Sequence, residues 1–286
     1  MRFNTPLRYP GGKGKLTDFI KLIFEHNNLM DGHYVEPYAG GAGIALNLLL
    51  DSYASSIHLN DLNPAVYAFW HSVLNAPDEL CKLISSARVT MSNWHKQKAI
   101  MSNPNDYTTL EVGFATFFLN RTNRSGILLG GVIGGKNQDG KWLLNARFNK
   151  PELISRIQRI ALYESRIKLY NLDAKELISS VFPSLPEKTL VYLDPPYYIK
   201  GQGLYQNHYI HKDHVEISQA VKKIKLPWIV SYDHTPEIMD MYKWCNGITY
   251  GINYSAQNRY QGAEAMFFSK KLIIPDVMNP SKLSAA

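Results

Sequence analysis

The feature that most constrains this chain of 286 residues is a strand, a glycine-rich turn, a helix, a second strand and an acid, in that order. Residues 33–37 predict a strand that runs into a turn at Gly40, and residues 44–50 have the apolar spacing of a helix. Residues 57–60 predict a second strand, which ends at Asp61. Nucleotide-binding sheets begin with this order, so we expect an α/β fold.

The glycine-rich turn lacks the full G-x-G-x-x-G spacing, because Leu46 stands where the third glycine would be. Asp61 follows Gly40 by about 20 residues, which is where an acid usually holds a pair of ribose hydroxyls. Alternatively, Asp61 is the acid at the start of a helix that begins at Asn63-Pro64, and one carboxylate could serve both purposes. The spacing favours a cofactor that contains a nucleoside.

The α/β pattern stops after about residue 75 and returns after Pro151. The middle contains a helical stretch at residues 110–120, followed by Gly-Gly and Asp139-Gly140 turns that predict loops and a hairpin. The last part predicts strands and helices in alternation: strands at residues 166–170, 190–193, 228–231 and 265–274, and helices at residues 174–180 and 214–225. We therefore expect a Rossmann-like sheet in residues 1–75 and 151–286, with residues 76–150 inserted as a mainly helical domain with a hairpin.

Asp194, Pro195, Pro196 and Tyr197 close the buried strand at residues 190–193. Proline fixes φ and has no backbone N–H, so this turn is rigid and rich in acceptors. A planar base with an exocyclic amine fits such a turn, because the amine can donate to a carboxylate and a carbonyl while the tyrosine stacks on the ring. The same four residues also occur at ordinary strand ends, so the context has to decide.

The N-terminal loop at residues 7–13 carries a second pair of glycines and Lys13. It is not a Walker A loop, because Gly14 follows Lys13 where a serine or threonine would stand. The loop still offers N–H groups and one lysine, which are enough to bind a carboxylate. A solvated lysine in a flexible turn is the alternative.

The net charge of +7 suits a polyanionic partner. Two cysteines provide neither a disulfide framework nor a thiolate zinc site, and the histidines at residues 211–214 match no metal-ligand spacing, so we interpret them as a helix start with solvated charges. The N-terminus lacks a signal sequence, and no apolar run is long enough to cross a membrane. We expect no metal, no membrane partner and a cytoplasmic location.

Residues 7–16, 34–46 and 190–198 together resemble the N-terminal motif, the glycine motif and the D-P-P-Y motif of Dam-type (D12 class) DNA adenine-N6 methyltransferases. The order of the motifs also fits, and the resemblance covers roughly residues 5 to 270. It implies a methyltransferase that uses S-adenosyl-L-methionine and acts on double-stranded DNA. One departure is Ala42, which stands where many members have a second glycine.

The resemblance also implies site residues. Those for S-adenosylmethionine are Tyr9 and Lys13, the latter near the methionine carboxylate, then Glu36, Tyr38 and Gly40 beneath the methionine end, Asp61 at the ribose, and Asp173 and Asp194 beside the cofactor. The catalytic residues are Asp194, Pro195, Pro196 and Tyr197, which would hold a flipped adenine.

Residues 120–126 resemble the DNA-reading segment of the family, and we expect Arg121, Asn123 and Arg124 to contact DNA. The resemblance implies a monomeric bacterial or phage enzyme of the kind found in restriction-modification. Three alternatives remain: methylation of cytosine N4 in DNA, methylation of RNA, and a DNA-binding relative without activity. A nicotinamide-dependent oxidoreductase is disfavoured by the missing third glycine.

Overall fold

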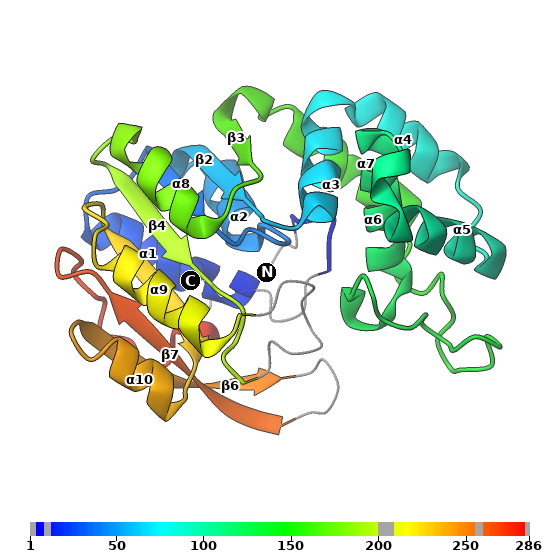
Figure 1. Ribbon diagram of the computed structural model, residues 1–286. Coiled ribbons are helices and arrows are strands. Elements are labelled where there is room, and N and C mark those ends of the chain that lie inside the picture. Colours follow the sequence, from blue (N-terminus) through cyan, green and yellow to red (C-terminus); the bar gives the residue numbers. More distant parts are fainter. Residues whose placement is uncertain (1–3, 9–12, 200–208, 255–259, 284–286) are drawn as a thin grey trace. The chain divides into compact units, whose positions relative to one another are not determined.

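The computed structural model describes residues 4–8, 13–199, 209–254 and 260–283 (Figure 1). The chain forms two compact units, which are described separately. The sheet unit contains Lys13–Leu62 and Arg166–Ala286, and the helical unit contains Phe3–Gly12 and Asn63–Ser165. The helical unit includes all of the segment 76–150 that was expected as an insertion and extends beyond it at both ends.

The sheet unit is built on seven strands in the order β3-β2-β1-β4-β5-β7-β6. The strands are β1 (Gly32–Glu36), β2 (Ala54–Asn60), β3 (Ile167–Tyr170), β4 (Thr189–Leu193), β5 (Trp228–Asp233), β6 (Asn246–Tyr254) and β7 (Tyr260–Phe268). The first five are parallel, while β7 runs antiparallel to both β5 and β6. The chain winds outward from β1 in one direction and from β4 in the other, so the switch point of a doubly wound sheet lies between them. The expected α/β, Rossmann-like sheet is confirmed.

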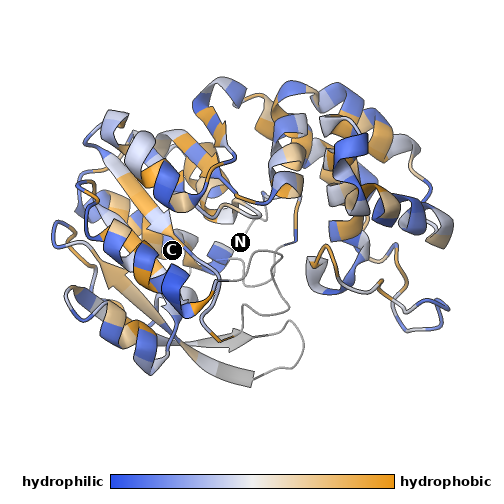
Figure 2. Ribbon diagram, viewed as in Figure 1, coloured by the Kyte–Doolittle hydropathy of each residue, from blue (hydrophilic) through white to orange (hydrophobic). Residues whose placement is uncertain are grey.

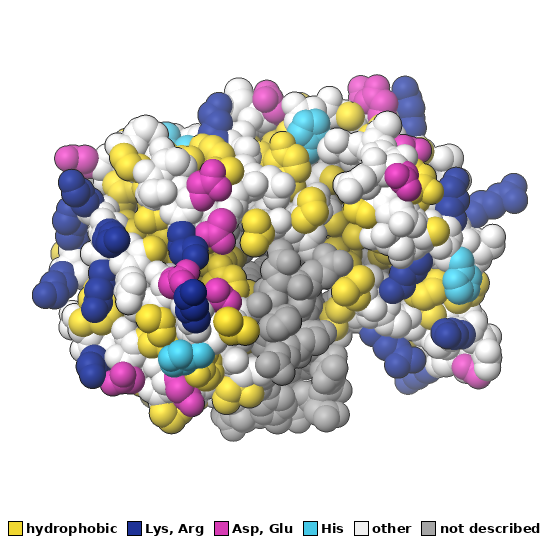
Figure 3. All heavy atoms as spheres, viewed as in Figure 1, with side chains coloured by type: hydrophobic (Ala, Val, Ile, Leu, Met, Phe, Trp, Pro, Cys, Tyr) yellow, Lys and Arg dark blue, Asp and Glu magenta, His cyan; other side chains and the backbone are white. Residues whose placement is uncertain are grey.

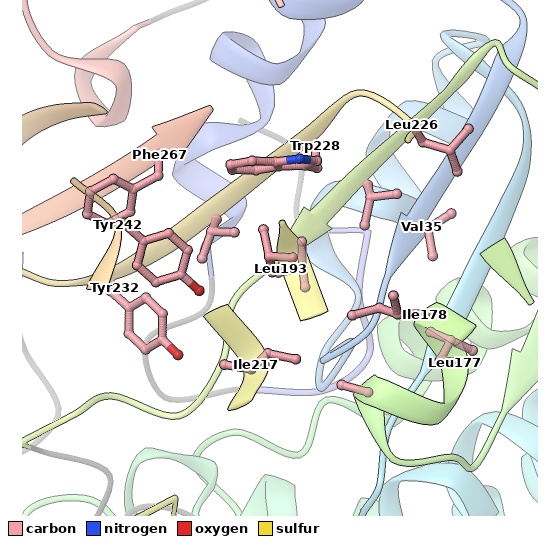
Figure 4. Packing of buried hydrophobic residues seen from close by; sticks show 14 of the residues in the cluster. Val35, Leu177, Ile178, Leu193, Ile217, Leu226, Trp228, Tyr232, Tyr242 and Phe267 are labelled. Carbon is pink, nitrogen blue, oxygen red and sulfur yellow. The ribbon is translucent and has the colours of Figure 1, made fainter. Parts of the chain in front are cut away.

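Helices cover both faces of this sheet (Figure 1). They are α1 (Thr17–His26), α2 (Gly43–Leu50), α8 (Ala174–Ser180), α9 (His211–Val221) and α10 (Pro236–Met241), with short 3-10 turns η1 (Lys13–Leu16), η4 (Glu164–Arg166), η5 (Phe182–Ser184) and η6 (Pro280–Lys282). On one face, residues of α8, α9 and α10 pack against alternate strand residues, and Figure 4 shows the ring of Tyr242 beside those of Phe267 and Tyr232. On the other face, Phe24 of α1 contacts Tyr34, which is adjacent to Val35 in β1. Strand residues thus alternate between two cores, as burial on both faces requires.

The helical unit consists of α3 (Pro64–Asn75), α4 (Pro77–Ser86), α5 (Met91–Ser102), α6 (Thr109–Thr122) and α7 (Lys150–Ala161), with η2 (Pro104–Asp106) and η3 (Arg124–Gly126). Helix α6 is its centre: Thr108 and Glu111 form a capping box at its start, and Val112 to Asn120 are all buried. Phe117 stacks on Phe69 of α3, and Phe118 contacts Phe148. Figure 2 shows where polar and apolar residues lie along these helices. Because residues 112–120 of α6 are buried on every side, this helix has to lie inside its unit.

The prediction of a hairpin after Gly126 is wrong. Residues 127–149, all of which the structure describes, contain no strand, and one isolated bridge joins Asn123 and Val132. The side chain of Gln138 connects this loop where hydrogen bonds between two strands were expected. Its amide donates to the carbonyls of Ile133 and Gly135, and its oxygen accepts from the Leu144 N–H. The glycine turns were recognised, but no alternating apolar residues flank them to pair as strands.

Two further differences concern the last part of the chain. Strand β7 ends at Phe268, before the expected end at residue 274, and its partner β6 was not expected. Within the described residues, every helix is too short or too polar to span a bilayer.

Candidate active site

Four acids stand where parallel strands of the sheet unit end. Glu36 and Asp233 are the last residues of β1 and β5, and Asp61 and Asp194 directly follow β2 and β4. The carboxyl ends of parallel strands share one edge of a sheet, and ligands of doubly wound folds bind outside that edge at the switch point. Among the described residues, no group of three or more His, Cys, Asp or Glu is arranged to hold a metal ion.

The glycine turn between β1 and α2 is shaped by two residues with positive φ. Gly40 has φ of 47° and Ala42 has φ of 48°, so both lie in the left-handed region. That conformation costs an ordinary residue about 1 kcal/mol, so a glycine adopts it more readily than Ala42 does. The N–H of Gly40 donates to Oδ2 of Asp61 over 2.9 Å, which ties the turn to the end of β2. The turn therefore keeps its shape although Ala42 replaces a glycine.

Glu36 lies buried beneath the start of α2. Its Oε1 accepts hydrogen bonds from the Tyr34 hydroxyl (3.1 Å) and the Ala45 N–H (3.3 Å). Burial raises the pKa of Glu36 to about 8, against the opposing effect of these two bonds. At neutral pH the group is mainly protonated, so it presents a neutral O–H donor and no negative charge.

Asp194 is held by its strand neighbours. Ser231 of β5 donates to Oδ1 over 2.7 Å, and the ammonium of Lys13 lies 3.3 Å from the same oxygen. Because Ser231 has a single hydrogen, the Tyr192 hydroxyl, 2.8 Å away, must be the donor to Ser231. Oδ2 accepts no hydrogen bond from the part of the chain that the structure describes. Burial raises the pKa of Asp194 to about 6, although Lys13 opposes this.

Asp233 fixes the turn that follows. Its two carboxylate oxygens accept the N–H groups of Tyr198 (2.8 Å) and Ile199 (3.1 Å). Pro195 and Pro196 have no N–H, so these are the first backbone donors beyond Tyr197 that can anchor the turn from outside. Asp233 was not identified from the sequence, although it lies only two residues beyond the strand expected at 228–231.

Tyr197 is 5% exposed, with its hydroxyl inside a charged cluster. The hydroxyl donates to Glu264 over 2.6 Å and accepts from Lys13 over 3.1 Å, and the Lys13 ammonium lies 5.0 Å from the ring centre. The structure thus brings Lys13, Asp194 and Tyr197 together, as the sequence predicted for one site. Stacking of a base on the Tyr197 ring remains a prediction.

Glu264 of β7 is the main site residue that sequence reasoning missed. It is fully buried and accepts from Lys13 over 2.7 Å and from the Tyr250 hydroxyl over 2.7 Å. Burial alone would lower the pKa of Lys13, but Asp194, Tyr197 and Glu264 hold it well above its ordinary value. Glu264 directly precedes the strand expected at residues 265–274, and an acid next to that apolar start was the available signal.

The remaining predicted cofactor residues lie at or near the same edge. Asp173 begins α8, just after β3, and accepts the N–H of Lys175 over 2.9 Å. The hydroxyl of Tyr38 lies 3.0 Å from that of Tyr209. Tyr9 lies outside the described residues.

In the helical unit, the predicted DNA-binding residues have different surroundings. Asn123 is fully buried: its oxygen accepts from the Trp94 indole over 2.7 Å, and its amide donates to the carbonyls of Ile127 and Leu128. Arg121 is half-buried and donates to the Arg147 carbonyl over 2.7 Å, and burial lowers its pKa to about 10. Arg124 is exposed. Figure 3 shows basic side chains gathered over the loop that follows.

The switch point and its acidic edge define the sheet unit as an α/β fold that binds a nucleotide-like cofactor. The sequence matches the model of the D12 class N6 adenine-specific DNA methyltransferases over residues 9–256, nearly the whole chain. The chain belongs to this family. It is therefore a methyltransferase whose cofactor is S-adenosylmethionine.

Similarity to solved structures is weak. A candidate RNA methyltransferase from Pyrococcus horikoshii, PH1948, is 9% identical with a TM-score of 0.41, over 88% of this chain and 80% of that one. A dimethyladenosine transferase from Plasmodium falciparum is 11% identical with a TM-score of 0.36, over 92% of this chain and 63% of that one. Similarities at this level define neither a fold nor an activity. No curated protein matches the sequence.

Proposed function

We propose that the protein transfers a methyl group from S-adenosylmethionine to N6 of adenine in double-stranded DNA, after the base has been flipped out of the duplex. The observation that carries the proposal is the carboxylate of Asp194, which is half-buried at a turn whose two prolines have no N–H and which keeps Oδ2 without a partner among the described residues. Such an oxygen is an acceptor for an exocyclic amine.

The amine of adenine is a poor nucleophile because its lone pair is delocalised into the ring. Accepting its two N–H groups at Asp194 Oδ2 and at the Pro195 carbonyl would draw the nitrogen toward sp³ geometry and free the lone pair. Hydrogen bonds to a charged acceptor contribute about 1.5–3 kcal/mol. Positive charge that develops on N6 is met by Asp194, so the interaction strengthens in the transition state.

Ser231 has a supporting role in this proposal. It occupies Oδ1 from the neighbouring strand, which fixes the orientation of the carboxylate and reserves Oδ2 for the substrate. Tyr192 in turn orients Ser231. A pre-oriented acceptor needs no reorganisation when the base arrives.

The carboxyl edge also fits a cationic cofactor. Among the described residues, Lys13 is the only basic side chain in contact with the carboxylates of Asp194 and Glu264, so a negative charge remains. When bound, S-adenosylmethionine supplies a methyl group activated on a sulfonium. We propose Lys13, Glu36, Tyr38, Gly40, Asp61, Asp173 and Asp194 as the residues that hold it.

The helical unit is proposed to recognise DNA, with Arg121 and Arg124 as its contacts to the duplex. Asn123 would then act by shaping the loop, because its amide is already used inside the protein. A base stacked inside a duplex cannot reach the carboxylate of Asp194, so flipping is part of the proposal, and Tyr197 is the proposed stacking partner. We expect a monomer that works in the cytoplasm.

A methylation assay on matched duplexes tests the proposal. Duplexes in which only adenine or only cytosine carries an exocyclic amine target are incubated with labelled cofactor. We expect methyl transfer to adenine, and a loss of at least about 100-fold in Asp194→Asn. Cofactor affinity should be largely retained, because Asp194 is only one of the residues proposed to hold the cofactor. Asp240→Asn, the same change at an exposed aspartate of the sheet unit, should keep the rate.

Transfer to cytosine alone would replace the adenine assignment with the N4 alternative. Full turnover by Asp194→Asn would remove the mechanism. Absence of transfer to any DNA, together with transfer to RNA, would move the substrate to RNA.

A further inference from the structure

Glu264 occupies a fully buried position of the sheet unit, where an isolated charge is unfavourable. It lies on β7, with Asp233 of β5 opposite on one side and Tyr250 of β6 opposite on the other. Its side chain is fully buried. A carboxylate at such a place needs a cation and several hydrogen bonds, or it would take up a proton.

The surroundings of Glu264 supply both. Oε1 accepts from Lys13 and from the Tyr197 hydroxyl, and Oε2 accepts from the Tyr250 hydroxyl, all within 2.7 Å. Burial would raise the pKa of Glu264, but Lys13 and these three bonds together hold it below its ordinary value. Glu264 therefore carries a negative charge at the centre of the cluster.

Lys13 lies between two carboxylates at unequal distances. Its ammonium is 2.7 Å from Glu264, the length of a strong charge-assisted hydrogen bond, and 3.3 Å from Asp194, which is longer than such a bond. Without the nearer carboxylate, the same ammonium would be free to close on Asp194. A closed ion pair would withdraw charge from the oxygen that the substrate amine needs.

We propose that Glu264 is a positioning residue for methyl transfer, which holds Lys13 and Tyr197 from β7 and so keeps the carboxylate of Asp194 available as the acceptor for the target amine. This inference rests on the proposed function. It adds a residue that does not touch the substrate and acts through Lys13.

Asp194 has other ionisable neighbours, and they separate into two groups. Tyr34, Tyr192, Tyr232 and Glu36 are uncharged near neutral pH, because burial raises their pKa values. The groups that influence Asp194 from each surrounding element are Lys13 (η1), Tyr34 and Glu36 (β1), Tyr192 (β4), Tyr197 (the turn), Tyr232 (β5) and Glu264 (β7). The charged neighbours that remain are Lys13, which lowers the pKa of Asp194, and Glu264, which raises it.

The test compares Glu264→Gln with the wild type by two pH profiles. One is kcat/KM for adenine methylation, whose acid limb reports ionisation of the free enzyme. The other is a carbon NMR titration of protein labelled at aspartate carboxyl groups, with the Asp194 signal assigned by Asp194→Asn. Tyr250→Phe is the matched control, because it removes a bond to the same carboxylate without changing a charge.

In Glu264→Gln, we expect the acid limb and the Asp194 titration to move to lower pH by about one unit, and the rate on the plateau to fall. In Tyr250→Phe, both titrations should stay where they are in the wild type. The movement distinguishes positioning from a structural defect, because a loosened site would not make Asp194 a weaker base in a defined direction. An unchanged titration in Glu264→Gln, or a shift to higher pH, would overturn the inference.

A neutral pair provides a second variant if Glu264→Gln alone does not fold. Lys13→Gln with Glu264→Gln removes both charges, a replacement that buried ion pairs often tolerate. Lys13 affects Asp194 more than Glu264 does, so the double variant should titrate at higher pH than the wild type. A titration at the wild-type pH or below would contradict the inference. The NMR titration needs no DNA, so a wild-type enzyme inactive on adenine would refute the proposed function separately.

Discussion

The sheet unit and the helical unit each carry a polar motif that the sequence marks as functional, but the motifs are used differently. In the D-P-P-Y turn of the sheet unit, Asp194 keeps an oxygen without a partner among the described residues. In the segment 120–126 of the helical unit, the side-chain amides of Asn120 and Asn123 form hydrogen bonds within the protein. Residues of similar polarity therefore keep an acceptor available in one unit and form structural hydrogen bonds in the other.

The backbone around each motif explains the difference. After α6, the chain turns through Ser125 and Gly126, both with positive φ, and this leaves carbonyls without helical partners. Asparagine can supply those carbonyls with two donors, which is its usual function at such turns. A side chain on Gly126 would come within 2.2 Å of the Arg8 carbonyl oxygen, so the turn is packed tightly against the N-terminal segment of its own unit.

The D-P-P-Y turn makes no comparable demand on its own side chains. Two of its residues have no N–H, and the N–H groups of Tyr198 and Ile199, which follow the turn, are satisfied by Asp233 from outside it. Asp194 does not have to anchor the turn, because Asp233 accepts these two N–H groups.

Among the substitutions that test this comparison, Asn123→Ala should have the largest effect. It leaves the buried Trp94 indole and two carbonyls without their partner, so we expect the free energy of unfolding to fall by about 3 kcal/mol. Urea denaturation of the full chain measures the change. Asn137→Ala, at an exposed position of the same unit, is the control and should leave stability unchanged. Retained stability with lost DNA affinity would return Asn123 to the base-contacting role that the sequence suggested.

A smaller effect is expected from Arg124→Glu, which alters an exposed residue of the same segment. Charge reversal should weaken DNA binding by about tenfold and reduce the slope of log affinity against log salt by about 1–2, with little change in stability. Binding to a labelled duplex at several salt concentrations measures both quantities. Lys82→Glu, on α4, makes the same change in net charge. If the two variants had the same salt dependence, Arg124 would have no special position at the duplex.

The smallest effect concerns pH and should appear in the sheet unit. The histidines at residues 211–214 do begin a helix, but His214 is buried and not solvated: its Nδ1 lies 3.0 Å from the Tyr232 hydroxyl. Burial lowers the pKa of His214 to about 4. The unfolded chain binds the proton more readily, so this contribution to stability is complete above about pH 6.5 and is lost as the pH falls toward 4.

We therefore expect the melting temperature of His214→Phe to fall less between pH 7 and pH 5 than that of the wild type does. The two decreases should differ by a few degrees. Thermal unfolding at several pH values measures it, and His95→Gln, at an exposed site of the helical unit, should follow the wild type. Equal acid sensitivity in all three proteins would show that His214 does not contribute. Hydrogen exchange at pH 5 is a separate measurement. Because the sheet unit contains buried ionisable groups, we expect its amides to exchange before those of the helical unit.

Much of the sheet unit was predictable because its signals are local. The predicted helix at 174–180 matches α8, and the strands at 190–193 and 228–231 match β4 and β5 to within a few residues. An acid directly after a parallel strand also has a defined place, since all carboxyl ends meet at one edge. The helical unit was less predictable, because the turns after Gly126 were recognised but their partners were not.

The sequence by itself determined where most strands lie along the chain, the glycine turn, and Asp61 and Asp194 at the carboxyl edge, since each depends on a short stretch of chain. Only the tertiary structure decided that Glu264 lies beside Lys13 and Tyr197 and that Asn123 is interior. The antiparallel insertion of β7 between β5 and β6 brings Glu264 to the site, and pairing between segments far apart in the chain leaves no local pattern to read. Burial of an amide likewise depends on which carbonyls the folded chain leaves unsatisfied.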